Sequence, residues 1–170
     1  IQHIWIAGPV YIFIPHPIAG QWGGIRFNPG ALSGSRISGA IIEYATNGIY
    51  LHTTSPEISD SIFRRNVDGI ETYMSSPNVS GCAFDANTNG INVNRGSYPD
   101  IGNSLFINND SGIYAATNTN SYPAIPKIHN NVPNDNRYGI RIGNVYTNTL
   151  RQYATIEYNT IVDNNTGIYF

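Results

Sequence analysis

Seven Gly-Ile dipeptides recur at nearly regular intervals along this chain of 170 residues. Their isoleucines are Ile25, Ile49, Ile70, Ile91, Ile113, Ile140 and Ile168. A repeat of about 21 residues is typical of a solenoid, in which each repeat forms one coil that stacks on the next. The sequence therefore predicts a single domain built from stacked coils.

A second column of apolar residues precedes these isoleucines by a constant distance. Six residues lie 12 positions before the isoleucines from Ile49 to Ile168, namely Ile37, Ile58, Val79, Ile101, Ile128 and Ile156. The other arc of each coil varies in length, and its longest versions run from Ala116 to Lys127 and from Gly143 to Thr155. We therefore expect one side of each coil to be a fixed frame and the other side to accept insertions.

Two further columns within the frame have nearly uniform chemistry. The first is mostly large and apolar: Ile42, Phe63, Phe84, Phe106, Pro133 and Ile161. After Ala45, the second is all asparagine: Asn66, Asn87, Asn109, Asn136 and Asn164. Because stacked coils pair as parallel strands about 4.8 Å apart, we expect the apolar column to be a continuous core and the asparagines a hydrogen-bonded ladder. Gly and Asn also suit tight turns, since they accept a left-handed backbone at low cost.

The pattern excludes a helical repeat. Apolar residues alternate with a period of two, as in Ile49 with Leu51, and Gly or Pro recurs too often for long helices. A leucine-rich repeat would need many more leucines than the four present. We predict an all-β parallel β-helix formed by one domain over residues 1–170, with an opening coil over 1–24 and Gly-Ile repeats over 25–170.

Each module carries, in order, an Ile, a Ser or Asn, a Phe or Ile, an Asn and the Gly-Ile pair. This module resembles the repeat of right-handed β-helix proteins of the pectate-lyase-like superfamily, and the segment Trp22-Gly23-Gly24-Ile25-Arg26-Phe27 is similar to the first coil of many bacterial and archaeal surface-protein members. The resemblance covers about residues 10–170. It implies a right-handed, single-stranded parallel β-helix of about seven coils. It specifies no activity, because the superfamily includes lyases, hydrolases, adhesins and structural modules.

Composition limits the partners and the location. The net charge of −2 and the pI near 6.0 argue against a nucleic-acid partner, which requires a basic surface. Residues 1–25 carry no charged side chain, but three prolines interrupt them, so we expect short strands, for example over residues 10–14, and no membrane span. Low charge with many Asn, Ser and Thr is common in secreted and surface proteins. Cys82 is the only cysteine and is expected to be a buried core residue.

The strand after each Gly-Ile pair provides the candidate binding surface. Its outward residues combine tyrosines with charged and amide groups, an arrangement that suits a glycan because a ring packs on a sugar face while polar groups bind hydroxyls. Both long insertions leave this strand. The glycan-binding candidates are Tyr50, His52, Glu71, Tyr73, Tyr114, Arg141 and Tyr146. The alternative interpretation is that these residues decorate an exposed sheet, where tyrosine has a high β propensity.

Catalytic groups are sparse. Polysaccharide cleavage would need paired carboxylates, or a carboxylate-bound metal with a basic residue, and Glu71 is the only carboxylate of the tyrosine column. Glu43, Arg64 and Asp85 form another outward column, which we interpret as a structural ladder of opposite charges. The acidic calcium cluster and arginine of pectate lyases and the Asp and His motif of polygalacturonases have no match. The four histidines occupy different columns, which argues against a metal site, and no cofactor is implied.

Both ends of the chain are apolar and strand-like, and residues 167–170 stop in mid-coil with no closed cap at the C-terminus. We expect either a fragment of a longer surface protein or protomers that stack end to end as a filament. The sequence thus predicts an extracellular or cell-surface structural or adhesive module, with self-association and weak polysaccharide contact. The alternative is a polysaccharide lyase or glycoside hydrolase, or a fragment of one.

Overall fold

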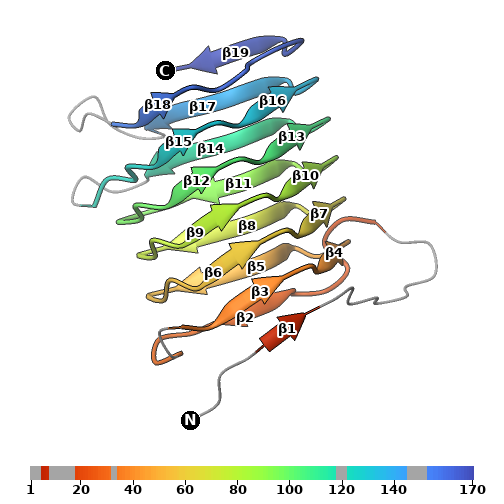
Figure 1. Cartoon of the computed structure of the whole chain (residues 1–170), viewed down its shortest axis with the longest axis vertical. Coiled ribbons are helices and arrows are strands. Elements are labelled where there is room, and N and C mark those ends of the chain that lie inside the picture. The colour runs from red at the N-terminus through yellow and green to blue at the C-terminus, as the bar shows by residue number, and fades with distance from the viewer. Residues whose placement is uncertain (1–4, 8–17, 32–33, 118–121, 145–152) are drawn as a thin grey trace.

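The computed structural model describes residues 5–7, 18–31, 34–117, 122–144 and 153–170. These residues form only strands and connecting turns, and the strands stack in one column from β1 at one end to β19 at the other (Figure 1). Within the same residues, no helix is long and apolar enough to cross a membrane. The all-β solenoid predicted from the repeat is confirmed. The expected strand over residues 10–14 lies outside the described residues.

Each complete coil contributes one strand to each of three parallel sheets. Sheet 1 contains β1 (Trp5–Ala7), β3 (Arg36–Ser38), β6 (Glu57–Ser59), β9 (Asn78–Ser80), β12 (Asp100–Gly102), β15 (Lys127–His129) and β18 (Thr155–Glu157). Sheet 2 contains β4 (Ile41–Glu43), β7 (Ile62–Arg64), β10 (Ala83–Asp85), β13 (Leu105–Ile107) and β16 (Val132–Asn134). Sheet 3 contains β2 (Ile25–Phe27), β5 (Asn47–His52), β8 (Asp68–Tyr73), β11 (Asn89–Val93), β14 (Ser111–Thr117), β17 (Tyr138–Asn144) and β19 (Thr166–Tyr169).

The isoleucine columns are vertical neighbours, as the repeat predicts. In sheet 3, Ile91 pairs with Ile70 on one side and Ile113 on the other. In sheet 1, Ile58 pairs with Val79, the equivalent residue of the next coil. All five side chains are fully buried. The register is strongly fixed, because a shift of one residue would turn each column towards solvent.

Aromatic stacking fills the core behind sheet 2. Phe63, Phe84 and Phe106 are completely buried, and their rings lie nearly parallel with centroids 5.0 Å and 4.7 Å apart. Cys82 is also buried and forms no disulfide, as expected. One continuous core therefore runs along the axis, and each coil depends on its neighbours for burial.

The repeated glycines are required by close contact between coils. A Cβ atom at Gly69 would lie 2.5 Å from the carbonyl oxygen of Gly90 and 2.9 Å from the ring of Phe84. From Gly48 onwards, the glycines of the Gly-Ile pairs do not have a positive φ. Left-handed φ values occur instead one residue before each ladder asparagine. The expectation of Gly or Asn at left-handed turns holds there at Asn108 and is wrong at Arg65, Ala86, Asp135 and Asp163. The geometry of the corner imposes this conformation on Arg65 and Ala86 at a cost of about 1–2 kcal/mol each.

The asparagine ladder is present as predicted. The side-chain amide of Asn66 donates to Oδ1 of Asn87 at 3.1 Å, and this bond repeats through Asn109 and Asn136 to Asn164. Each ladder oxygen also accepts the backbone N–H of the preceding asparagine. These bonds satisfy buried turn groups that have no partner within their own coil.

A second, shorter ladder was not predicted. It lies at the corner between sheets 1 and 2, where the Asn131 amide donates to Oδ1 of Asn159 at 3.1 Å and the Ser104 backbone N–H donates to Oδ1 of Asn131. In the earlier coils, the smaller residues Ser61 and Cys82 occupy this position. The predicted charge column is also in register, with Arg64 paired to Glu43 on one side and aligned with Asp85 on the other.

Candidate functional site

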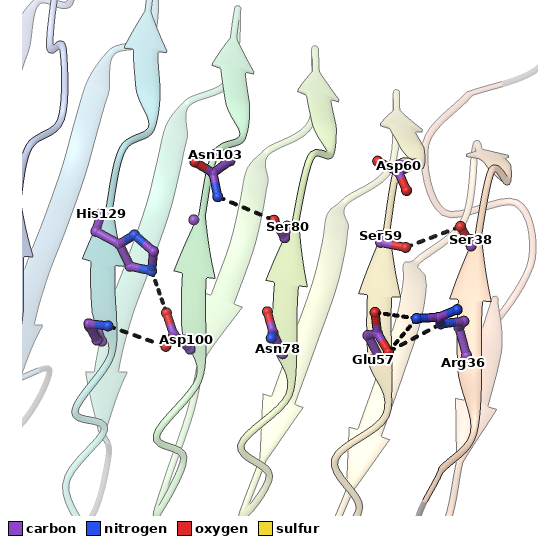
Figure 2. Close-up of a pocket in the computed structure, with 12 residues that line it drawn as sticks. Arg36, Ser38, Glu57, Ser59, Asp60, Asn78, Ser80, Asp100, Asn103 and His129 are labelled. Atoms are coloured by element: carbon purple, nitrogen blue, oxygen red, sulfur yellow. Dashed lines mark hydrogen bonds and ion pairs between the residues drawn. The ribbon is translucent and has the colours of Figure 1, made fainter.

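A polar groove of about 500 Å³ runs along the outer face of sheet 1. Twelve residues line it, and they come from five successive strands, β3, β6, β9, β12 and β15, and from the turns that follow (Figure 2). One outward column contributes Arg36, Glu57, Asn78, Asp100 and Lys127, and the second contributes Ser38, Ser59, Ser80, Gly102 and His129. Side chains with hydrogen-bonding groups therefore occupy nearly every position of the groove.

Ion pairs flank the centre of this groove. The guanidinium of Arg36 donates to both carboxylate oxygens of Glu57, with its closest contacts at 2.7 Å. On the other side, Lys127 Nζ lies 3.5 Å from Asp100 Oδ2. Asn78 lies between the two pairs on the middle strand (Figure 2). The order of charges along the column is therefore positive, negative, neutral, negative, positive.

His129 is held in place by contacts on both ring nitrogens. Its Nε2 lies 2.6 Å from Asp100 Oδ1 (Figure 2). Its Nδ1 lies 3.0 Å from the Asn130 amide. The ring occupies space left open by Gly102, where a Cβ atom would lie only 2.6 Å from the imidazole. With both nitrogens engaged, His129 is oriented as part of the groove wall.

Hydroxyl and amide groups line the remainder of the groove. Ser59 Oγ donates to Ser38 Oγ at 3.1 Å, and the Asn103 amide donates to Ser80 Oγ at 3.4 Å. Both bonds connect neighbouring coils, so the donors and acceptors repeat along the axis (Figure 2). Sequence reasoning missed this groove. The available signal was that the residues on either side of each sheet 1 isoleucine column are polar or glycine in every coil from Arg36 to His129.

The glycan-binding candidates predicted from the sequence lie on sheet 3. The structure places Tyr50, Glu71, Tyr114 and Arg141 in one outward column and pairs His52 with Tyr73 in the next. Tyr146 lies outside the described residues. The insertions begin after β14 and β17, which belong to sheet 3 as expected.

Guanidinium groups cover several of the sheet 3 tyrosines. The Cζ atom of Arg26 lies 4.3 Å from the Tyr50 ring centroid, and that of Arg141 lies 5.1 Å from the Tyr114 centroid. His52 contacts the Tyr73 ring edge-on with a centroid distance of 5.1 Å. These cation–π and edge contacts stabilise the side chains against one another.

A profile of the right-handed β-helix region matches residues 23–170 of the chain. The chain belongs to the right-handed β-helix family. Searches of curated proteins and of solved structures gave no match. The family confirms the resemblance found in the repeat, and it agrees with the three stacked parallel sheets of this β-helix.

The β-helix also contains a pair of carboxylates on β8 that accept hydrogen bonds from side-chain amides. Asp68 is buried and accepts hydrogen bonds from the Asn89 and Asn92 amides at 2.7 and 3.0 Å. Glu71 is half-buried and accepts from the Asn47 and Asn94 amides. Burial raises the pKa of Asp68, and burial together with the nearby Asp68 raises the pKa of Glu71.

Sequence reasoning singled out Glu71 but missed Asp68. The signal was the position directly before each glycine, where Asn47, Asp68 and Asn89 share one column. Among the described residues, no group of three or more His, Cys, Asp or Glu side chains is arranged to hold a metal ion. The described residues offer hydrogen bonding along sheet 1, aromatic and cationic contact on sheet 3, and two carboxylates on β8 whose pKa values are raised.

Proposed function

We propose that this β-helix is an extracellular or cell-surface module with a structural or adhesive role, and that it binds a linear polysaccharide along the groove of sheet 1. The observation that carries the proposal is the groove itself, which is hollow and lined by hydrogen-bonding side chains over five successive coils. A composition rich in Asn, Ser and Thr with only 12% charged residues supports the location.

The repeat of the groove suits a repeating ligand. Its hydroxyl, amide and carboxylate groups recur with the strand spacing of about 4.8 Å, so successive sugar units along the axis meet similar groups. Sugar hydroxyls both donate and accept, which suits a column in which Asn78 separates Glu57 from Asp100. The groove offers little apolar surface, which favours hydroxyl-rich ligands over lipids or apolar peptides.

The sheet 3 column provides a second contact surface in this proposal. Tyr50, Tyr73 and Tyr114 offer ring edges and apolar area on a flat face, with the amides of Asn92 and Asn94 beside them. Since guanidinium groups already stack on Tyr50 and Tyr114, we expect this face to bind glycans more weakly than the groove.

A direct test uses affinity electrophoresis and calorimetry with a panel of neutral and acidic linear polysaccharides. The double variant Asn78→Ala/Ser80→Ala removes two hydrogen-bonding groups from the centre of the groove, and about 1 kcal/mol for each lost bond corresponds to binding weaker by about tenfold or more. Thr88→Ala changes an exposed residue in a turn of the same coil, outside the groove, and should leave binding unchanged. Binding that is absent for every polysaccharide, or unchanged in the double variant, contradicts the proposal.

A carbohydrate-active enzyme is the second candidate function. The specific observation in its favour is the raised pKa of the neighbouring carboxylates Asp68 and Glu71, since a carboxyl group with a raised pKa can serve as a general acid. The same panel, assayed for new reducing ends and unsaturated products, tests this candidate. Turnover that is lost in Glu71→Gln or Arg141→Ala would establish the enzyme and contradict a purely structural role.

End-to-end stacking of protomers is the final element of the proposal. A second protomer placed against the rung of β19 would continue the strand ladder of sheet 3 in the same way as β17 pairs with β19. Electron microscopy of the purified chain at high concentration should then show elongated particles, and uniformly short particles would contradict stacking.

A further inference from the structure

The outer face of sheet 2 carries a continuous apolar stripe. In each of its five strands, the first residue is apolar and points outward, and these residues align in register from coil to coil. The stripe consists of Ile41, Ile62, Ala83, Leu105 and Val132. Three of the large side chains, Ile62, Leu105 and Val132, are 37%, 39% and 38% exposed.

Backbone propensity alone does not explain this stripe. The strands of sheet 1 have the same three-residue length and parallel pairing, yet the corresponding outward column, from Arg36 to Thr155, is polar in every coil. Contiguous apolar surface of this kind marks an interaction site.

The third residue of each sheet 2 strand forms a second outward column, in which two neighbouring residues, Arg64 and Asp85, have opposite charges. Arg64 contacts Glu43 through Nε, which leaves its terminal N–H groups outside this ion pair. Asp85, one coil further along, accepts the amide of Asn108 at 3.0 Å, and no ion pair involves its carboxylate among the described residues. A basic residue and an acidic residue therefore lie on adjacent rungs beside the stripe.

We propose that sheet 2 is the interface of a homodimer in which two copies of this chain pack face to face. The two-fold axis runs parallel to the strands and passes between β7 and β10. This operation reverses the order of the coils while keeping each outward column opposite its own copy. It places Arg64 opposite Asp85 of the second copy, Ile62 opposite Ala83, and Ile41 opposite Leu105.

The arrangement agrees with both columns at the centre of the interface, where Ile62 meets Ala83 and two symmetry-related ion pairs form between Arg64 and Asp85. Further from the axis, Glu43 faces Ile107 of the second copy, and β16 lies outside the overlap. The overlapping face measures about 15 Å by 10 Å, since four strands lie about 4.8 Å apart and each is three residues wide. An interface of this size is below the standard range, so the dimer should be weak and concentration-dependent.

The dimer leaves sheets 1 and 3 uncovered, because only sheet 2 takes part. Each copy would keep its own sheet 1 groove, and a polysaccharide that engages both grooves of a dimer would be bound with a higher apparent affinity. Dimerisation itself does not depend on the proposed glycan binding, because it uses a different face.

Sedimentation equilibrium of the 170-residue chain from about 10 μM to 1 mM tests the interface in the range expected of small contacts. We expect reversible dimers for the unmodified chain and dimerisation at least about tenfold weaker for Leu105→Lys, which puts a charge into the stripe. Thr88→Lys adds the same charge at an exposed turn outside sheet 2 and should dimerise normally. Circular dichroism confirms that each variant is folded.

An exchange of charges tests the geometry. Arg64→Asp and Asp85→Arg should each weaken the dimer, and the double variant should restore it, because the opposite charges again face each other across the axis. Failure of the folded double variant to recover overturns the arrangement. A chain that stays monomeric at all concentrations, or an association insensitive to Leu105→Lys, overturns the interface itself, and the latter outcome would instead indicate end-to-end stacking.

Discussion

Replacing Asn87 with alanine removes four hydrogen bonds from the middle of the asparagine ladder. Its Oδ1 accepts the backbone N–H and the side-chain amide of Asn66 at 2.9 and 3.1 Å. Its own amide donates to the Phe63 carbonyl at 3.0 Å and to Asn109 Oδ1 at 3.1 Å. Asn87 is almost completely buried, so water does not readily replace these partners.

The expected loss of stability follows from the groups left behind. The variant deprives the Asn66 N–H and the Phe63 carbonyl of buried partners, and each such group costs about 1–3 kcal/mol. The free energy of unfolding should fall by about 2–6 kcal/mol, which is a large part of the roughly 5–15 kcal/mol typical of a domain. Urea unfolding followed by far-UV circular dichroism measures the change through the transition midpoint.

Two variants serve as controls for this prediction. Thr88→Ala changes the next residue, which is exposed, and should alter the unfolding free energy by less than about 0.5 kcal/mol. Asn164→Ala removes a ladder residue that is only half-buried, so its loss should be intermediate. If Asn87→Ala were no more damaging than Thr88→Ala, the ladder would not stabilise the coil stack and the reasoning would be refuted.

Three further predictions use the same chain. Gly90→Ala would place a Cβ atom 2.5 Å from the Gly112 carbonyl oxygen and should cost more than about 3 kcal/mol or prevent folding, whereas Gly23→Ala, with no atom within 4 Å, should have little effect in thermal melts. Burial raises the pKa of Cys82 to about 11, so its thiol should resist Ellman's reagent at about pH 8 and react fully in urea; rapid reaction of the folded chain would contradict its burial. Burial also raises the pKa of Asp68, so its contribution to stability is present below its usual pKa and is lost as the pH rises through the raised value. Asp68→Asn should therefore weaken the fall in urea midpoint between about pH 4 and pH 7, and an unchanged profile would show that Asp68 does not titrate as proposed.

The architecture could be predicted because its determinants are local and repeated. The constant spacing between the two isoleucine columns leaves one way to stack Ile70 on Ile91, and the glycine before each isoleucine allows the close approach of neighbouring coils. The asparagine ladder follows from the same periodicity, since identical side chains on adjacent rungs can bond to one another. Each coil repeats this information, so a single substitution such as Ala45 for Asn does not obscure it.

The groove on sheet 1 could not be predicted in the same way. Its side chains were visible as polar residues beside the isoleucines, but two of the residues that line it, Asp60 and Asn103, come from the turns that follow the strands. The shape of its wall also depends on β12, where Gly102 takes the position of a serine in the preceding coils. The missing side chain leaves room for the His129 ring to reach Asp100. Asp68 was missed for a related reason, because its side chain bonds to Asn92 of the next coil as well as to the directly aligned Asn89, and the repeat does not reveal that diagonal contact.

The inward columns of this β-helix are constrained by packing between coils, whereas the outward columns are not. Functional residues are therefore expected among the outward columns. Inward positions are fixed by stacking, so every coil must repeat them. Outward positions are free, yet sheet 1 is polar, sheet 2 is apolar along its first column, and sheet 3 combines tyrosine with arginine. Stacking of the coils alone does not require the outward residues of the three sheets to differ in chemistry over five coils. The proposed contacts assign a different role to each face, and an exchange of outward columns between sheets 1 and 2 should preserve the fold while abolishing the proposed polysaccharide binding.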